Sequence, residues 1–464
     1  MLVAYLTDGM SSSVNASLAL SRRLTEAGHQ VVYLSPADVA SVVEAEGFSF
    51  LRLTGDQYFV ERSHPVPWTA LRHPRRWLRA LRDRHAIRQA SIENDEIEVA
   101  VARLDPDVLL LDFEMHMAVF ATAKLGIPTF LTTVFFSVFR RPGLPPLDSP
   151  TTVAGPGELR RQWWSARART RGLEARQRLI RFVLGDWFRP ARYDSMDVTT
   201  LRQIARSRGI RFGDVVDRGN WQRPFTHRNL PMLSFSLLEM ELPHDPHPLL
   251  HHVGPMVAIE RSEPVLGAAA REAWRRFDDE REDGRPLVYC ALGTHWNLDV
   301  DLLERVLGVF EVRGDWDLVI GLGGGARHER FGLAPRNVLV LDYAPQLDVL
   351  AASDVCLTHG GATTVAECVV LGVPMVVYST GHVDQNGNGA RVGFHGLGVV
   401  GDTSTDGRVE IEHNISLVLT DPSFRARTTR IQQLAEAGAD RAVRLIEASL
   451  GPITHPSGSQ STKG

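Results

Sequence analysis

The amino-acid sequence predicts an α/β protein built from two doubly wound parallel sheets. Short apolar runs alternate with segments of helical periodicity in residues 1–131, and the same alternation resumes at residue 286. Strands that alternate with helices of this length are typical of parallel βαβ units. Between the two series, a stretch rich in proline and histidine breaks regular structure, which predicts a linker at residues 242–264.

The first series begins with an apolar strand at 2–6, a serine-containing turn, and a helix at 16–27 that Gly28 ends. Its further elements are predicted at 30–34, 37–46, 48–53, 108–111, 114–125 and 129–131. An irregular segment rich in proline, arginine and tryptophan follows, and we interpret residues 142–224 as helices and loops inserted in this domain. The N-terminal domain is therefore predicted to span residues 1–241.

The second series defines a C-terminal domain at residues 265–451. Its elements are predicted at 286–292, 300–312, 318–321 and 337–341, followed by a glycine-containing turn and a long last helix at 423–450. The polar residues 452–464 lack the apolar content needed for a packed core, so a disordered tail is predicted there.

Composition excludes several classes of function. A chain of 464 residues with a net charge of −4 gives no reason to expect a nucleic-acid partner. Three scattered cysteines indicate buried, reduced thiols, and the N-terminus lacks a secretory pattern, so a cytoplasmic protein is expected. The apolar stretch at 130–139 is too short to cross a membrane, and the arginine-rich segments are interpreted as solvated helix faces. No Cys/His cluster for zinc occurs, and the short Asp-x-Asp matches at Asp105–Asp107 and Asp299–Asp301 are interpreted as chance, so neither a metal nor a cofactor is expected.

A phosphate site is predicted where the strand at 354–357 meets Gly360 and Gly361 and then a helix. Glycines at such a turn let a ligand approach the backbone, and the first N–H groups of the helix lack internal partners. These groups and the positive end of the helix dipole bind anions. Hydroxyl donors and a ring N–H stand at the same end of the helix, from Thr363, Thr364 and His359.

The flanking residues extend this site to a nucleotide sugar. The segment Tyr343–Gln346 offers an aromatic face on which a base stacks. Glu367, one helical turn beyond the threonines, supplies a carboxylate that accepts hydrogen bonds from ribose hydroxyls. Downstream, Asp384 and Gln385 provide acceptors and donors for sugar hydroxyls. Groups for base, ribose, diphosphate and sugar are therefore all present in one C-terminal segment.

These motifs resemble the donor-binding signature of the UDP-glycosyltransferase superfamily, the inverting GT-B group that includes bacterial natural-product, macrolide and carotenoid glycosyltransferases. The resemblance implies two Rossmann-like domains that face a cleft, with a UDP- or dTDP-sugar in the second and a hydrophobic acceptor in the first. It also implies that the last helix crosses back to the first domain. The implied donor-binding residues are Thr294, Tyr343, Ala344, Gln346, His359, Gly361, Thr363, Thr364, Glu367, Asp384 and Gln385.

The sequence departs from this family at the catalytic base. The resemblance implies a histidine after the first strand, oriented by an aspartate after the fourth. Alignment of the helix around Val14–Leu20 places Ser11 at the histidine position, whereas Asp112 keeps the aspartate. The candidate bases are Asp112 itself, His116, Asp384 and His295. Two alternatives are an acceptor acidic enough to need little base, such as a phenol, and a chain that has lost catalysis.

The predicted function is an inverting glycosyltransferase of natural-product or antibiotic biosynthesis, active as a monomer or homodimer. The resemblance implies contacts from Asp384 and Gln385 to a glucose-like sugar, and hence a hexosyltransferase. One alternative is a catalytically silent GT-B helper or binding subunit, which the serine at the base position favours. A nucleotide-sugar epimerase on the same fold is a third possibility.

Overall fold

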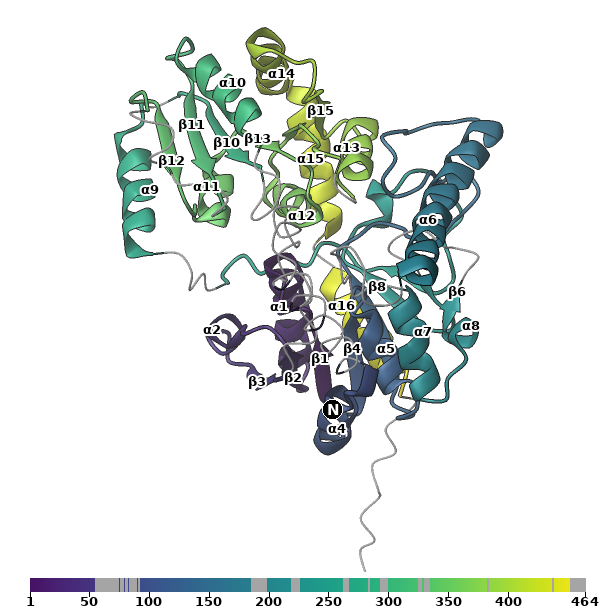
Figure 1. Ribbon diagram of the computed structural model, residues 1–464. Coiled ribbons are helices and arrows are strands. Elements are labelled where there is room, and N and C mark those ends of the chain that lie inside the picture. The colour runs from purple at the N-terminus through teal and green to yellow at the C-terminus, as the bar shows by residue number, and fades with distance from the viewer. Residues whose placement is uncertain are drawn as a thin grey trace, which may run out of the picture.

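A computed structural model describes most of the chain (Figure 1). The described residues are 1–54, 92–184, 198–217, 226–261, 267–282, 284–292, 299–323, 334–381, 384–435 and 438–450, together with 75, 79, 82, 90 and 328. The predictions for Thr294, His295 and the disordered tail at 452–464 lie outside them.

The N-terminal half forms a seven-stranded sheet in which every neighbouring pair is parallel, in the order β3-β2-β1-β4-β5-β8-β9. Strand β1 lies between β2 and β4, so the strand order reverses there. In open α/β sheets, ligands bind beyond the carboxyl ends of the strands at such a reversal. The strands are β1 (Leu2–Leu6), β2 (Gln30–Ser35), β3 (Ser49–Arg52), β4 (Val108–Asp112), β5 (Thr129–Thr133), β8 (Met232–Ser234) and β9 (Leu250–His252).

Helices and a small hairpin complete this half. Helix α6 (Pro156–Leu184) is the longest described helix and lies on the outer flank of the molecule (Figure 1). The other elements are α1 (Ser11–Glu26), α2 (Ala40–Val43), α4 (Glu96–Leu104), α5 (His116–Thr122), α7 (Val198–Ser207), α8 (Phe212–Val215), η5 (Leu238–Met240) and the antiparallel pair β6 (Val216–Asp217) and β7 (Thr226–His227).

The C-terminal half contains a six-stranded, fully parallel sheet in the order β12-β11-β10-β13-β14-β15, which reverses at β10. The predicted pair of doubly wound parallel sheets is confirmed. The strands are β10 (Leu287–Ala291), β11 (Asp317–Gly321), β12 (Val338–Leu341), β13 (Val355–Thr358), β14 (Met375–Val377) and β15 (Gly398–Val400). The helices are α9 (Ala268–Glu280), α10 (Val300–Phe310), α11 (Gln346–Ala352), α12 (Ala362–Leu371), α13 (Gln385–Phe394), α14 (Arg408–Thr420) and α15 (Pro422–Ala435).

The last helix, α16 (Gly438–Ala448), lies beside the N-terminal sheet although it follows α15 of the C-terminal half (Figure 1). It packs against α1, and Val443 and Ile446 belong to the same apolar cluster as Leu18. The backbone passes very close to the linker, because a Cβ at Gly438 would stand 2.0 Å from the carbonyl oxygen of Val253. The end of the chain therefore joins the two halves, while the exact domain boundaries stay a prediction.

A buried ion pair joins the halves a second time. Arg391 of α13 places Nη2 2.5 Å from Oε1 of Glu241, which follows η5, and Nε of the arginine donates to the same oxygen at 2.6 Å. The backbone N–H of Ser137 donates to Oε2 of Glu241 at 2.9 Å, and the ring of Phe136 lies under the guanidinium. Both side chains are fully enclosed, so this pair fixes α13 against the N-terminal half.

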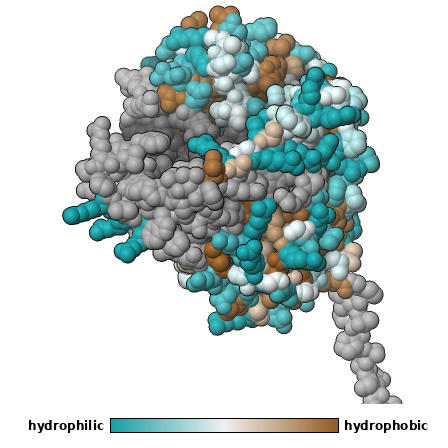
Figure 2. Space-filling view, turned by 45° about the vertical axis from the view of Figure 1, so that its right-hand side comes forward, coloured by the Kyte–Doolittle hydropathy of each residue, from teal (hydrophilic) through white to brown (hydrophobic). Residues whose placement is uncertain are grey.

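The described surface is mixed in polarity. On the face seen in Figure 2, hydrophobic and hydrophilic residues are intermingled outside the grey region. None of the helices in the described part of the chain combines the length and the apolar character needed to cross a membrane.

Candidate active site

The predicted phosphate site begins at a turn that requires glycine. Gly360 follows β13 with φ +84°, a conformation that residues with a Cβ rarely adopt. A Cβ at this position would also stand 3.0 Å from Val377 Cγ1 and 3.1 Å from the carbonyl oxygen of Gln385. The turn therefore brings β13, β14 and α13 together directly before helix α12 begins.

The first turn of α12 carries N–H groups that have no partner within the helix itself. Gly361 stands at the N-cap without a side-chain cap, and the first N–H groups of a helix lack partners within it. The His359 ring lies against this end, because a Cβ at Gly361 would stand 2.6 Å from Nε2, and Nδ1 donates to the Ala291 carbonyl at 3.3 Å. The Thr363 hydroxyl is buried without a hydrogen-bond partner among the described residues. An unsatisfied buried hydroxyl costs about 1–3 kcal/mol, which a ligand oxygen would offset.

Asp384 lies against the same helix end. Its Oδ2 accepts from the backbone N–H of Ala362 at 3.2 Å and from the amide of Asn388 at 2.7 Å. Gln385 is likewise engaged, since its Oε1 accepts from both the backbone N–H and the hydroxyl of Thr380. The structure thus brings both predicted sugar contacts to the α12 N-terminus, where they hold the protein's own donors.

The predicted ribose contact forms part of a buried network. Glu367 of α12 accepts from the Gln346 amide on one oxygen and pairs with Arg261 on the other. The Tyr289 hydroxyl of β10 donates to the side-chain Oε1 of Gln346 at 3.2 Å. Tyr343, the predicted stacking residue, is 38% exposed and adjoins this network through Ala344 and Pro345. The chain segments predicted to hold base, ribose and diphosphate are therefore adjacent in space.

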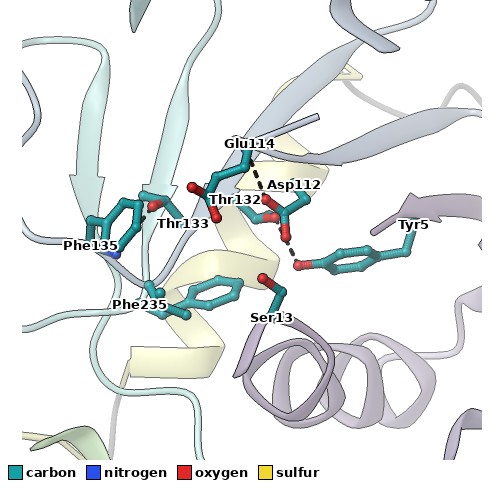
Figure 3. Close-up of a pocket in the computed structure, with 9 residues that line it drawn as sticks. Tyr5, Ser13, Asp112, Glu114, Thr132, Thr133, Phe135 and Phe235 are labelled. Atoms are coloured by element: carbon teal, nitrogen blue, oxygen red, sulfur yellow. Dashed lines mark hydrogen bonds between the residues drawn. The ribbon is translucent and has the colours of Figure 1, made fainter. Parts of the chain in front are cut away.

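A small pocket in the N-terminal half holds the aspartate predicted as the base (Figure 3). Asp112 ends β4, is almost fully buried, and accepts from the Glu114 backbone N–H at 2.9 Å. Ser13 of α1 projects toward this carboxylate (Figure 3). The lining residues are Tyr5, Ser13, Asp112, Glu114, Thr132, Thr133, Val134, Phe135 and Phe235.

The structure places Ser13, rather than Ser11, opposite Asp112. Helix α1 begins at Ser11, five residues before the predicted start at Ala16. Ser11 is therefore exposed at the helix end, whereas Ser13 faces the pocket from the first turn. The serine that faces Asp112 is therefore two residues further along the helix than the predicted Ser11.

His116, the second predicted base, is fully enclosed at the start of α5. Its ring packs against Phe113 and against His227, with centroids 5.6 Å and 5.2 Å away. Burial lowers the pKa of His227 to about 3. His116 does not line the described pocket, so an aromatic packing role accounts for its position.

A second carboxyl lies close to Asp112. Burial and the charge of Asp112 raise the pKa of Asp8 to about 7, opposed by hydrogen bonds from the Met10 backbone and from Ser13. Burial also raises the pKa of Asp112, opposed by donation from the Glu114 backbone and Ser13. Sequence reasoning missed Asp8, because nothing in a turn of this composition indicates a second carboxyl beside the fourth strand.

This pair predicts a pH-dependent stability. Between roughly pH 4 and pH 7 the folded chain holds protons that the unfolded chain has released, so the free energy of unfolding falls as pH rises. Asp8→Asn removes one titrating group. The free energy of unfolding of this variant, relative to that of the natural chain, is therefore expected to be higher at pH 8 than at pH 4.5. Thermal unfolding at both pH values measures the difference, with Asp38→Asn as an exposed control. An equal shift of Tm at both values would contradict the pairing.

Comparison with known proteins gives a family match to the C-terminal half. Residues 306–442 match the family described as erythromycin biosynthesis protein CIII-like, C-terminal domain. The demethyllactenocin mycarosyltransferase of Streptomyces fradiae is 33% identical over 190 residues, which are 40% of this chain and 39% of that protein. The oleandomycin glycosyltransferase of Streptomyces antibioticus is 32% identical over 173 residues, which are 36% of this chain and 39% of that protein. The matches thus span about two fifths of these relatives.

Solved structures match over almost the whole chain. The glycosyltransferase of kitacinnamycin covers 97% of this chain and 99% of its own, with a TM-score of 0.66 and 19% identity. The calicheamicin glycosyltransferase CalG4 covers 98% and 99%, with a TM-score of 0.63 and 19% identity. The fold is therefore GT-B. The family match is confined to residues 306–442, and over the rest of the chain the likeness to these structures is one of fold.

Proposed function

We propose that this chain is an inverting glycosyltransferase that moves a sugar from a UDP- or dTDP-sugar to a hydroxyl of a hydrophobic small-molecule natural product. The observation that carries the proposal is the N-terminus of α12. There a glycine turn and a histidine ring meet a buried threonine hydroxyl that has no hydrogen-bond partner in the described part of the chain. Relatives named as glycosyltransferases and glycosyltransferase neighbours of the same fold support this reading.

In the proposed complex, Tyr343 stacks on the base and Glu367 accepts from the ribose. The first N–H groups of α12 hold the diphosphate together with His359, Thr363 and Thr364. Asp384 and Gln385 would exchange their present partners for the hydroxyls of a glucose-like sugar. Helix N–H groups aimed at a developing anion stabilise a leaving group without reorganisation, so the proposal needs no metal.

The transfer step uses the pocket around Asp112. The Asp112 carboxylate takes the proton of the acceptor hydroxyl. At the same time, the oxygen of that hydroxyl attacks the anomeric carbon from the face opposite the diphosphate. The new carbon–oxygen bond forms as the bond from the anomeric carbon to the diphosphate breaks, and the departing oxygen keeps the electron pair. The backbone N–H of Glu114 holds the carboxylate in place, and Ser13, which lines the same pocket, lacks the neutral-range pKa of an imidazole.

Glu367→Ala tests the donor assignment. The variant is expected to bind UDP and dTDP more weakly by about 1–3 kcal/mol, because a hydrogen bond to a charged group is lost. Titration calorimetry gives the affinity, and circular dichroism shows whether the fold is kept. Glu410→Ala removes an exposed glutamate of the same domain and serves as the control. Unchanged affinity in a folded Glu367→Ala protein would remove Glu367 from the nucleotide site.

Turnover distinguishes transfer from binding alone. The chain is incubated with UDP-glucose or dTDP-glucose and with a panel of phenols, macrolides and polyenes. Release of nucleoside diphosphate that depends on an acceptor, with a matching mass gain on that acceptor, is the expected result. Among the described pocket-lining residues no imidazole occurs, which favours a silent helper as the second candidate. Nucleotide binding without turnover on any acceptor would support that candidate.

A further inference from the structure

The carboxylate predicted to hold the ribose is closed off in this structure. Arg261 places Nη1 2.8 Å from Oε1 of Glu367, and the Gln346 amide donates to Oε2. The side chain of Glu367 is 0% exposed and that of Arg261 is 4% exposed. Both oxygens of the carboxylate are therefore engaged, and neither faces solvent.

Arg261 reaches this position from the linker. Ala258, three residues earlier, packs in the apolar core of the N-terminal half, and the backbone N–H of Arg261 donates to the Ala258 carbonyl at 3.1 Å. Glu367 stands on α12 of the C-terminal half. The ion pair thus connects the two halves through one short turn of the linker.

We propose that Arg261 is a removable cap of the ribose subsite, which a nucleotide must displace before Glu367 can accept from its hydroxyls. The inference rests on the proposed function. The guanidinium occupies the place of a hydroxyl donor, so the capped form cannot make the ribose contact. Donor binding therefore releases a contact between the linker and α12, and the position of the linker becomes coupled to occupancy of the nucleotide site.

The cap predicts a particular pattern of affinities. When a protein binds its ligand only in an open form, the apparent affinity is the intrinsic affinity reduced by the fraction that is open. That fraction belongs to the protein and not to the nucleotide. Removal of the cap must therefore increase the affinities for UDP and dTDP by the same factor. Removal of a residue that contacts only one of the nucleotides would instead change the ratio of the two affinities.

Arg261→Ala tests the cap in the full-length chain. Titration calorimetry with UDP and dTDP is expected to show both binding more tightly, by a common factor on the order of 3–30. Without nucleotide, the Tm is expected to fall, because removing one partner leaves a buried charge uncompensated. Saturating UDP should raise the Tm of the variant by more than it raises the Tm of the natural chain.

Two further variants make the test specific. Arg261→Lys keeps the charge but loses the planar guanidinium, so a smaller gain in affinity is expected. This variant replaces Arg261→Ala in the test if Arg261→Ala does not fold. Arg281→Ala breaks a similar pair away from the site, in which Nε of Arg281 (16% exposed) lies 3.1 Å from Oδ2 of Asp317 (2% exposed). This variant should have a lower Tm but an unchanged affinity for the nucleotides.

Unchanged or weaker binding of UDP and dTDP by folded Arg261→Ala would overturn the cap, and weaker binding would make Arg261 a nucleotide ligand instead. A changed ratio between the two nucleotides would also overturn it. If neither the natural chain nor the variant binds a nucleotide, the proposed function itself fails. The failure of the cap alone is therefore distinct from the failure of the donor site.

Discussion

Asp112→Asn is expected to lower kcat by roughly 10²–10⁴-fold, the usual contribution of a general base, with the affinity for UDP unchanged. Asparagine keeps the shape of the side chain and an oxygen that accepts from the Glu114 backbone N–H. It lacks the charge that takes the acceptor's proton. Steady-state rates with the best acceptor of the panel, together with calorimetric titration of UDP, separate the two effects.

Asp107→Asn is the matched control for this variant. Asp107 stands before the other end of β4 and accepts from the Leu2 backbone N–H at 2.7 Å, far from the pocket. Its replacement should leave kcat unchanged. Near-normal rates in Asp112→Asn would exclude Asp112 as the base and direct attention to Asp384 and His295.

Arg391→Met is expected to reduce the free energy of unfolding by about 3–5 kcal/mol, because Glu241 is left buried without its partner. The arginine also donates from Nη1 to the Gly387 carbonyl at 2.9 Å, and this bond is lost as well. Denaturant unfolding measures the change. Arg141→Met breaks the pair with Asp245, whose side chain is 84% exposed, and should cost no more than about 1 kcal/mol.

A double variant tests whether the loss comes from the pair. Glu241→Gln combined with Arg391→Met removes both charges, so it should destabilise the protein by less than the sum of the single changes. Strict additivity, or a cost of Arg391→Met similar to that of Arg141→Met, would show that the buried pair does not hold the two halves together.

The strand, turn and helix around Gly360 were predictable because their signals are local. A strand, a glycine with positive φ and a helix follow one another without interruption, and the turn geometry at Gly360 depends on residues close in sequence. The predicted strands begin and end within one residue of their observed bounds, except that β5 runs two residues further, whereas β8, β9, β14 and β15 were not predicted. Apolar runs of this kind report burial directly.

The base position was harder to predict because it depends on one helix boundary. The segment Ser11–Ser13 is poor in apolar residues, so periodicity places the helix start at Ala16, whereas α1 begins at Ser11. Three serines in succession leave the register open, and only the folded position shows that Ser13 faces Asp112. His116 was predicted to reach the cleft, but the aromatic rings of Phe113 and His227 enclose it.

Contacts between distant segments gave no sequence signal. Arg261 is one arginine among many, and its approach to Glu367 follows from the path of the linker. The pair of Glu241 and Arg391 is separated by 150 positions, and neither residue alone indicates a partner. Such contacts depend on how the two halves assemble, so local propensity and periodicity do not contain them.

Calorimetric titration of the full-length chain with UDP and dTDP tests the central claim most directly, because every assigned role depends on a nucleotide site at the α12 N-terminus. Saturable binding of at least one nucleotide to a single site, weakened in Glu367→Ala and retained in Asp112→Asn, is the predicted result. Absence of binding by both the natural chain and the uncapped Arg261→Ala variant would contradict the account.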